Sequence, residues 1–260
     1  MISRRPMVIG NWKMNLDHVE AIHLSKQIGV LLRQHSFDNV DVAVAPPFID
    51  LRSVTSVVDA DRLPLTVAAQ HVHPAENGAF TGEVSVPMLK RMGVTRVLIG
   101  HSERRQLFAM TDDVVNETLA AAVRGGLGAV LCVGEDLETR ESGDAVSYVH
   151  AQVAAALAGF SMKYAEQLTV AYEPIWAIGT GVTATSEQVA EMMAAVREAL
   201  PEPLRLDTPI LYGGSVKAEN AVDLVTEGRV DGFLVGGASL HAEGFVAIVR
   251  AVNDCYPVKR

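Results

Sequence analysis

The chain has 260 residues, of which 49% are hydrophobic and 5% aromatic, and its formal net charge at pH 7 is −9. An acidic surface repels nucleic acids and anionic membranes, so we expect neither as a partner. The two cysteines, Cys132 and Cys255, stand too far apart for a metal-ligand motif or a disulfide framework. Without a signal peptide or an apolar run of about 18 residues, the chain is expected to be cytoplasmic.

Eight short apolar runs recur along the chain, each nearly continuous in apolar character, as is typical of strands buried on both faces. In chain order the predicted strands are Met7–Met14, Val40–Ala45, Leu65–Ala69, Arg96–Ile99, Gly128–Cys132, Leu168–Tyr172, Ile210–Tyr212 and Gly232–Val235. Helical patterns separate them. Because open sheets usually stop at five or six strands, eight units predict an α/β fold, a closed (β/α)8 barrel that forms one domain over residues 1–260.

Two helical patterns carry an apolar stripe at a spacing of three and four residues, which is typical of a helix packed on a core. Thr185 and Gln188 form a candidate capping box before the second of them. The stripes consist of Val146, Val149, Val153, Ala156 and Leu157, and of Val189, Met192, Met193, Val196 and Leu200.

The first predicted strand ends in Asn11, Trp12 and Lys13. Catalytic groups of a parallel barrel stand at the carboxyl ends of its strands, and alternate residues of a strand share a face. Asn11 and Lys13 are therefore expected to point into the mouth of the barrel, with Trp12 on the opposite face. A lysine there is costly to desolvate unless it meets an anion. An ordinary solvated lysine at a strand end is the alternative.

The segment Gln70–Glu83, after the third strand, contains Pro74, Gly78 and Gly82 and shows no helical periodicity. Long irregular connections in a compact domain are usually functional or lie at an interface. We expect one of these roles for it.

His101 follows the fourth strand directly, and the polar stretch after it is expected to begin a helix. The amino end of a helix disfavours an imidazolium, so we expect His101 to be neutral and able to polarise a carbonyl. Glu103 with Arg104 and Arg105 either positions Lys13 or belongs to a cluster of surface ion pairs.

Glu173 ends the sixth strand, where an ordinary solvated carboxylate is not expected. The loop after it carries apolar side chains between proline and glycine hinges, which is typical of a lid. A hydrophobic loop docked permanently on the barrel is the alternative. The candidate lid consists of Pro174, Ile175, Trp176, Ala177, Ile178, Gly179 and Thr180.

Paired glycines follow the last two strands, at Gly213–Gly214 and Gly236–Gly237. They leave backbone N–H groups free to converge on an anion, and these two loops form the phosphate site of many barrels. A tight turn explains either pair alone but not both, so we expect a phosphate site here.

The sequence gives little support for a metal site or a dinucleotide-binding site. His71 and His73 have the spacing of a metal-binding pair, but no further ligand is near in the sequence. Gly179 and Gly181 lack the third glycine of a dinucleotide fingerprint. We expect no metal ion.

Five motifs at these strand ends resemble the triosephosphate isomerase family over nearly the whole chain. They read GNWKMN from Gly10, GHSERR from Gly100, AYEPIWAIGTG from Ala171, YGGSV from Tyr212 and GFLVGGASL from Gly232. The resemblance implies a TIM barrel that interconverts dihydroxyacetone phosphate and D-glyceraldehyde 3-phosphate through an enediolate, in glycolysis and gluconeogenesis, with no cofactor.

The resemblance also implies the residue roles. Glu173 would move the proton between the two carbons, with His101 as neutral electrophile and proton donor. Lys13 would stabilise the enediolate and phosphate charge. The other substrate-binding residues would be Asn11 for the substrate oxygens and Gly179, Ser215, Gly236 and Gly237 for the phosphate.

By the same resemblance, Gln70–Glu83 is the loop that reaches into the partner of a homodimer, with Thr81 approaching the partner's Asn11 and Lys13. The chain departs from the family in two places. His71 stands where asparagine is common, and Ile175 where valine is common. Neither touches the implied chemistry, but His71 leaves details of the interface open.

Two other functions remain as alternatives. An aldolase or ring isomerase on a phosphate-binding barrel would share the glycine loops but not Asn11, Lys13, His101 and Glu173 together. A barrel without catalysis, kept for binding phosphate or for adhesion at a surface, would be expected to lack one of the four, and all are present.

Overall fold

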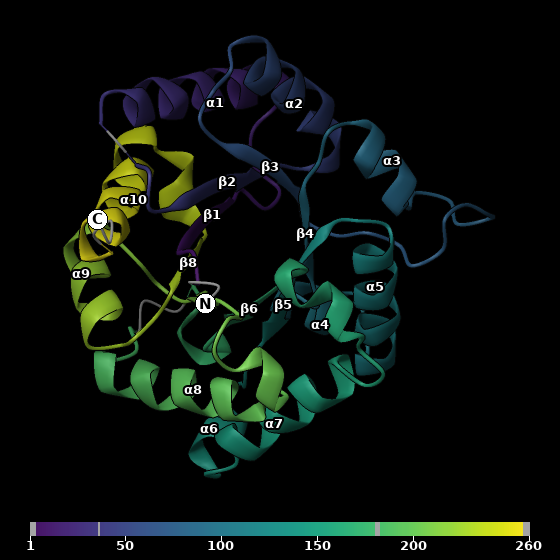
Figure 1. Cartoon of the computed structure of the whole chain (residues 1–260), viewed down its shortest axis with the longest axis vertical. Coiled ribbons are helices and arrows are strands. Elements are labelled where there is room, and N and C mark those ends of the chain that lie inside the picture. The colour runs from purple at the N-terminus through teal and green to yellow at the C-terminus, as the bar shows by residue number, and fades with distance from the viewer. Residues whose placement is uncertain (1–3, 36, 180–182, 257–260) are drawn as a thin grey trace.

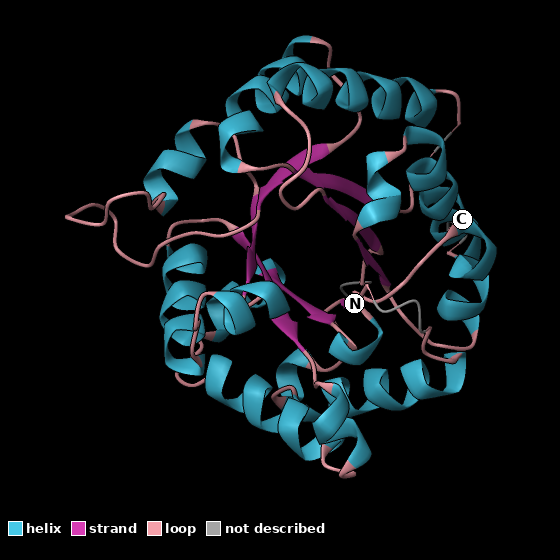
Figure 2. Cartoon of the chain, turned by 180° about the vertical axis from the view of Figure 1, so that it is seen from behind, coloured by secondary structure: helices cyan, strands magenta, loops and turns pink. Residues whose placement is uncertain are grey.

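The structure is a computed structural model that describes residues 4–35, 37–179 and 183–256. Within these residues eight parallel strands close into one barrel in chain order, surrounded by helices (Figures 1 and 2). The strands are β1 (Met7–Asn11), β2 (Asp41–Ala45), β3 (Thr66–Ala69), β4 (Arg96–Ile99), β5 (Gly128–Val133), β6 (Leu168–Tyr172), β7 (Ile210–Tyr212) and β8 (Gly232–Val235). The predicted barrel is confirmed.

The helices lie outside the barrel, between one strand and the next (Figure 2). They are α1 (His18–Arg33), α2 (Leu51–Ala60), α3 (Val86–Arg91), α4 (Ser102–Leu107), α5 (Asp112–Arg124), α6 (Leu137–Glu141), α7 (Ala145–Ala156), α8 (Ser186–Ala199), α9 (Ala218–Thr226) and α10 (Ala242–Cys255). Short 3-10 turns are η1 (Phe48–Asp50), η2 (Met162–Gln167), η3 (Ile175–Ala177), η4 (Glu202–Leu204) and η5 (Gly237–Leu240). No helix among the described residues is long and apolar enough to cross a membrane.

The predicted extent of the first strand is wrong at its carboxyl end. The strand was expected to reach Met14, but β1 ends at Asn11. Lys13 has a φ of 52°, a left-handed conformation that β structure does not accommodate. Four strands have the predicted bounds, and the remaining three differ by a single residue at one end.

Alternation along β1 shows how the core divides into two layers. Met7 and Ile9 face the barrel interior, while Val8 packs in the outer layer between strands and helices. Trp12 also joins the outer layer and is fully buried, so its predicted face is confirmed. The interior is filled by Met7, Ile9, Ala43, Ala45, Ala68, Leu98, Val130, Cys132, Ala171, Leu211 and Leu234. This packed interior leaves the mouth of the barrel as the place for a site.

Helix α8 confirms the predicted stripe and cap. All five of its predicted stripe residues are buried. At its start, Gln188 Oε1 accepts from the Thr185 N–H at 3.0 Å, and Thr185 Oγ1 accepts from the Gln188 N–H at 3.3 Å. The reciprocal bonds satisfy two donors that the first turn of a helix leaves unpaired.

The segment Gln70–Glu83 contains no helix and reaches away from the barrel, between β3 and α3 (Figures 1 and 2). Its base is closed where the His73 N–H donates to the Val84 carbonyl at 2.8 Å. The prediction of a long irregular connection is confirmed, and its projection leaves the loop tip exposed.

Candidate active site

One cavity of about 640 Å³ opens at the carboxyl ends of the strands. It is a suitable size for a small ligand. Every residue predicted to act on or bind the substrate lines it: Asn11, Lys13, His101, Glu173, Gly179, Ser215, Gly236 and Gly237. These residues come from the ends of five strands, so the closed barrel is what brings them together.

Lys13 is held from several directions. Its backbone N–H donates to Asn11 Oδ1 at 3.1 Å, and its ammonium group donates to Glu103 Oε1 at 2.7 Å. The second contact agrees with the interpretation in which Glu103 positions Lys13, because its carboxylate pairs with that lysine. Lys13 also lies close to Gly236, where its Cε is 3.8 Å from the position that a Cβ would occupy.

His101 caps helix α4 and touches Glu173. Its Nδ1 accepts from the Glu103 N–H at 3.2 Å, and its Nε2 lies 2.9 Å from Glu173 Oε1. An Nδ1 that accepts a hydrogen bond carries no proton, so the bond fits a neutral ring with its proton on Nε2. The turn before it requires a glycine, since Gly100 has a φ of 72° and its carbonyl accepts from Arg105 Nε at 2.8 Å.

The pKa of His101 differs from the expectation that the helix end alone would lower it. Burial lowers this pKa, but the nearby Glu173 carboxylate outweighs burial and raises it above the ordinary value. The physical reason is the 2.9 Å contact between His101 Nε2 and Glu173 Oε1, which favours the charged ring.

Glu173 is only 2% exposed and is engaged by α4. Its Oε2 accepts from the Ser102 N–H at 2.8 Å while Oε1 faces His101. Gly134 fits against the Glu173 backbone so closely that a Cβ there would lie 1.8 Å from the Glu173 carbonyl oxygen. Both carboxylate oxygens of Glu173 therefore face a protein partner in this structure.

The segment after Glu173 is anchored by a buried carboxylate that the sequence analysis missed. Glu135 is fully buried, and its Oε1 accepts from Tyr172 Oη and from Trp176 Nε1, each at 2.9 Å. Arg140 lies 3.4 Å from the same oxygen. Burial raises the pKa of Glu135, although both hydrogen bonds oppose this. The sequence did contain a signal for this residue, because Glu135 stands two positions after the apolar strand β5, at the end of the barrel where functional groups gather.

Part of the candidate lid can be placed. Ile175–Ala177 form the turn η3, in which Ala177 is buried and Ile175 and Trp176 are half-buried. Ile178 and Gly179 line the cavity, whereas Thr180 lies outside the described residues. The apolar side chains of this loop are thus partly covered here rather than fully exposed.

The glycine-rich side of the cavity differs in one detail from the prediction. The Gly213 N–H already donates to the Tyr172 carbonyl at 2.7 Å, so it is not available to an anion. The N–H groups of Ser215, Gly236 and Gly237 have no acceptor within residues 4–35, 37–179 and 183–256. The predicted short turn after β8 is η5, which begins at Gly237.

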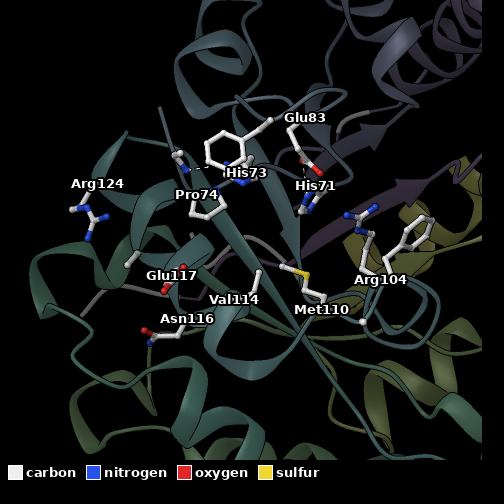
Figure 3. Close-up of a pocket in the computed structure, with 15 residues that line it drawn as sticks. His71, His73, Pro74, Glu83, Arg104, Met110, Val114, Asn116, Glu117 and Arg124 are labelled. Carbon is white, nitrogen blue, oxygen red and sulfur yellow. Dashed lines mark hydrogen bonds and ion pairs between the residues drawn. The ribbon is translucent and has the colours of Figure 1, made fainter. Parts of the chain in front are cut away.

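A second cavity of about 750 Å³ lies beside the base of the Gln70–Glu83 loop. Figure 3 shows Glu83 directed at His71, and His71 Nε2 is 3.2 Å from Glu83 Oε2. Burial and the neighbouring Arg104 lower the pKa of His71 to about 4 despite Glu83. His73 instead stacks on Phe80, with ring centroids 4.0 Å apart. No group of three His, Cys, Asp or Glu side chains in the described part of the chain is arranged to hold a metal ion.

The chain is similar to known proteins over nearly its whole length. A family model described as triosephosphate isomerase matches residues 6–252. The chain is 47% identical over 251 residues to the triosephosphate isomerase of Saccharopolyspora erythraea, covering 95% of this chain and 96% of that one. It is 45% identical over 254 residues to the enzyme of Streptomyces coelicolor (96% and 98% covered). It is 46% identical over 248 residues to that of Mycobacteroides abscessus (94% and 95% covered).

Proposed function

The chain belongs to the triosephosphate isomerase family, and from that premise we propose how its residues interconvert dihydroxyacetone phosphate and D-glyceraldehyde 3-phosphate. It is an intramolecular aldose–ketose isomerase of glycolysis and gluconeogenesis. The single observation that carries the assignment of roles is the convergence of Lys13, His101 and Glu173 on one cavity that also presents free backbone donors.

Glu173 is the base that moves the proton between the two carbons. This family is the established example of a glutamate in that role, so the assignment rests on the family as well as on the geometry. In the present conformation the carboxylate accepts from the Ser102 N–H. Substrate binding releases that bond and turns the carboxylate toward the carbon, and the buried surroundings keep water from competing for it.

His101 polarises the carbonyl and moves protons between the two substrate oxygens. Its pKa is raised in the free enzyme because Glu173 faces it. When Glu173 turns to the substrate that cause weakens, whereas burial and the charge of Lys13 continue to lower the pKa. The ring is then neutral and donates from Nε2, since Nδ1 remains bonded to the Glu103 N–H.

Lys13 and Asn11 stabilise the negative charge that develops on the substrate oxygens, and Glu103 positions Lys13. The phosphate binds the N–H groups of Gly179, Ser215, Gly236 and Gly237. A chain with a net charge of −9 attracts a dianion only where local donors outweigh that charge. The cavity supplies such a place, because Lys13 and Lys217 line it together with the backbone N–H groups of the glycine-rich loops.

The loop Pro174–Thr180 acts as a lid over the substrate. An enediolate next to a phosphate can eliminate it, so the intermediate has to be shielded from water. The bond from Trp176 Nε1 to Glu135 ties one end of the loop to β5. Among the described residues, Ile178 and Gly179 follow this anchor and line the cavity.

The proposed reaction needs neither a metal ion nor an organic cofactor. The test is the conversion of D-glyceraldehyde 3-phosphate to dihydroxyacetone phosphate by the purified protein in excess chelator, with nothing else added. We expect fast conversion. If a folded protein gives none, the second candidate takes its place, a barrel that binds phosphate or a surface without catalysis.

We also propose that two copies pair through the Gln70–Glu83 loop, with Thr81 approaching the partner's Asn11 and Lys13. Phe80 and Phe108 are 47% and 63% exposed and line the same second cavity, so the loop and its neighbourhood present apolar area that a partner copy would cover. Sedimentation velocity should give a dimer, and Thr81→Arg should shift it toward monomer. A parent protein that sediments as a monomer would disprove the pairing.

Two broader proposals complete the assignment. We infer that residues 1–260 form one domain, since the described residues from 4 to 256 belong to one barrel and its helices. We also infer that the protein acts in the cytoplasm, where its proposed substrates are made and used. Fractionation of intact cells tests the second proposal.

A further inference from the structure

Lys13 holds a backbone conformation that a residue with a side chain avoids. Its φ of 52° lies in the left-handed region, which is favourable mainly for glycine. Such a conformation persists only where surrounding contacts determine it. Asn11 holds the N–H of Lys13, and Glu103 holds its ammonium group. The remaining polar group of this residue is its carbonyl oxygen.

The Lys13 carbonyl is held by Gln70. The amide nitrogen Nε2 of Gln70 donates to the Lys13 oxygen at 2.8 Å and to the Ala45 oxygen at 2.8 Å. A side-chain amide nitrogen has two hydrogens, so both are used. The Ala45 oxygen also accepts from the Trp12 N–H at 3.1 Å. Gln70 therefore ties together the ends of three neighbouring strands.

The strand ends that Gln70 contacts are held by backbone pairing. Asn11 and Ala45 are register partners in the β1–β2 ladder, and Gln70 follows β3 directly. Gln70 is half-buried and does not line the active-site cavity. Its position fits a residue that acts on Lys13 rather than on the substrate.

We propose that Gln70 is a positioning residue for the reaction: its amide holds the carbonyl of Lys13 and thereby keeps that residue in the left-handed conformation that aims the ammonium group into the cavity. The proposal rests on the function proposed above for Lys13. Without the amide, the Lys13 carbonyl loses its donor and turns toward water, and the backbone relaxes to a negative φ. The ammonium group then shifts, and small displacements of a charged group at a reacting centre are expensive in rate.

The experiment is a double-mutant cycle with Gln70→Met and Lys13→Ala. Methionine keeps the length of glutamine but cannot donate. Gln167→Met is the matched control, because the Gln167 amide before β6 faces two carbonyls in the same way: turned so that its nitrogen faces them, it donates to Leu127 at 2.9 Å and to Val123 at 3.0 Å. Gln70→Glu, which keeps length and polarity but has no amide hydrogens, repeats the test if methionine impairs folding. Steady-state kinetics and thermal unfolding are measured for each protein.

We expect Gln70→Met to lower kcat/KM by about 10- to 100-fold, with both a higher KM and a lower kcat, as for a misplaced catalytic group. Gln167→Met should lower the melting temperature by about as much as Gln70→Met does, because each variant loses two hydrogen bonds. It should nevertheless leave kcat/KM within about twofold of the parent. In the Lys13→Ala background, Gln70→Met should change kcat/KM by less than about twofold, because residues that act as one unit are not additive.

Three results would overturn the proposal. One is a parent-like kcat/KM in Gln70→Met while Lys13→Ala is impaired. Another is the same fold-loss from Gln70→Met in both backgrounds, which would place its action outside Lys13. The third is a fully active Lys13→Ala variant, which would remove the role of Lys13 itself. The three patterns are distinct, so failure of the positioning role and failure of the proposed function are told apart.

Discussion

Two buried glutamates at neighbouring strand ends have opposite surroundings. Glu135 follows β5 and Glu173 follows β6, and they are 0% and 2% exposed. Glu135 is surrounded by tyrosine, tryptophan and arginine donors away from the cavity. Glu173 lines the cavity and is met by one imidazole and one backbone N–H.

The difference teaches that burial of a carboxylate does not by itself mark a catalytic group. The direction of the side chain decides which donors it meets. Tyr172 ends β6 and Glu173 follows it, and the two consecutive side chains point in opposite directions. The tyrosine donates to Glu135, while the glutamate faces His101. Tyr172, Trp176 and Arg140 all contact the Glu135 carboxylate, so Glu135 holds the segment after β6 in place. Glu173 meets fewer donors and lines the cavity, which agrees with the role of base proposed for it.

The largest effect is expected from shortening Glu173. Glu173→Asp withdraws the carboxylate by one methylene, so turnover should fall by about a hundredfold or more while KM changes little. Glu135→Asp is the matched control and should lower kcat by less than about tenfold. Steady-state kinetics on both variants measures the contrast. Parent-like turnover in Glu173→Asp would exclude this residue as the base.

Replacing His101 should come next in size. His101→Gln keeps a side-chain amide near the carbonyl but cannot exchange a proton between the substrate oxygens. We expect kcat to fall by about a hundredfold, as is usual when an acid–base group is lost. Exchange of solvent deuterium into the recovered substrate separates the steps, because Glu173 is still able to abstract the proton. Loss of this exchange together with turnover would contradict separate roles for the two residues.

The anchor should affect stability more than chemistry. Glu135→Gln keeps the shape but removes the charge that faces Arg140 and weakens the acceptor for two donors. It should lower the free energy of unfolding by about 2 kcal/mol, as expected for a buried charge-assisted network. Urea unfolding measures this loss, and kinetics should show a kcat within about tenfold of the parent. A loss of kcat as large as that of Glu173→Asp would erase the distinction between the two glutamates.

The smallest effect concerns protonation. Glu173 raises the pKa of His101 above its ordinary value of 6.5. A raised pKa stabilises the folded state fully below the unfolded pKa of the ring, and this contribution is lost as the pH rises through the folded pKa. Glu173→Gln should therefore lower the pKa of His101, as followed by NMR of the ring. The stability advantage of the parent should shrink as the pH rises above about 6.5. If the pKa of His101 is the same in Glu173→Gln as in the parent, Glu173 is not the cause of the raised pKa.

The strands, the barrel and the residues at its mouth were predicted from the sequence because their signals are local. Each buried strand is a short apolar run, and Asn11, His101 and Glu173 stand at the end of such a run or within two positions after it. Once eight parallel strands close, their carboxyl ends share one rim. Asn11, His101 and Glu173 were found in this way before any contact was known.

The tertiary structure alone decided how those residues are held. The left-handed turn at Lys13 ends β1 early, and the carbonyl of Lys13 accepts from Gln70, which is 57 positions away in the sequence. The rise in the His101 pKa depends on Glu173, and the anchor at Glu135 depends on Trp176. Apolar periodicity is a property of neighbouring residues in one segment, and it is visible in a single sequence. Hydrogen bonds and charge pairs between segments depend on distances that exist only when the barrel has closed.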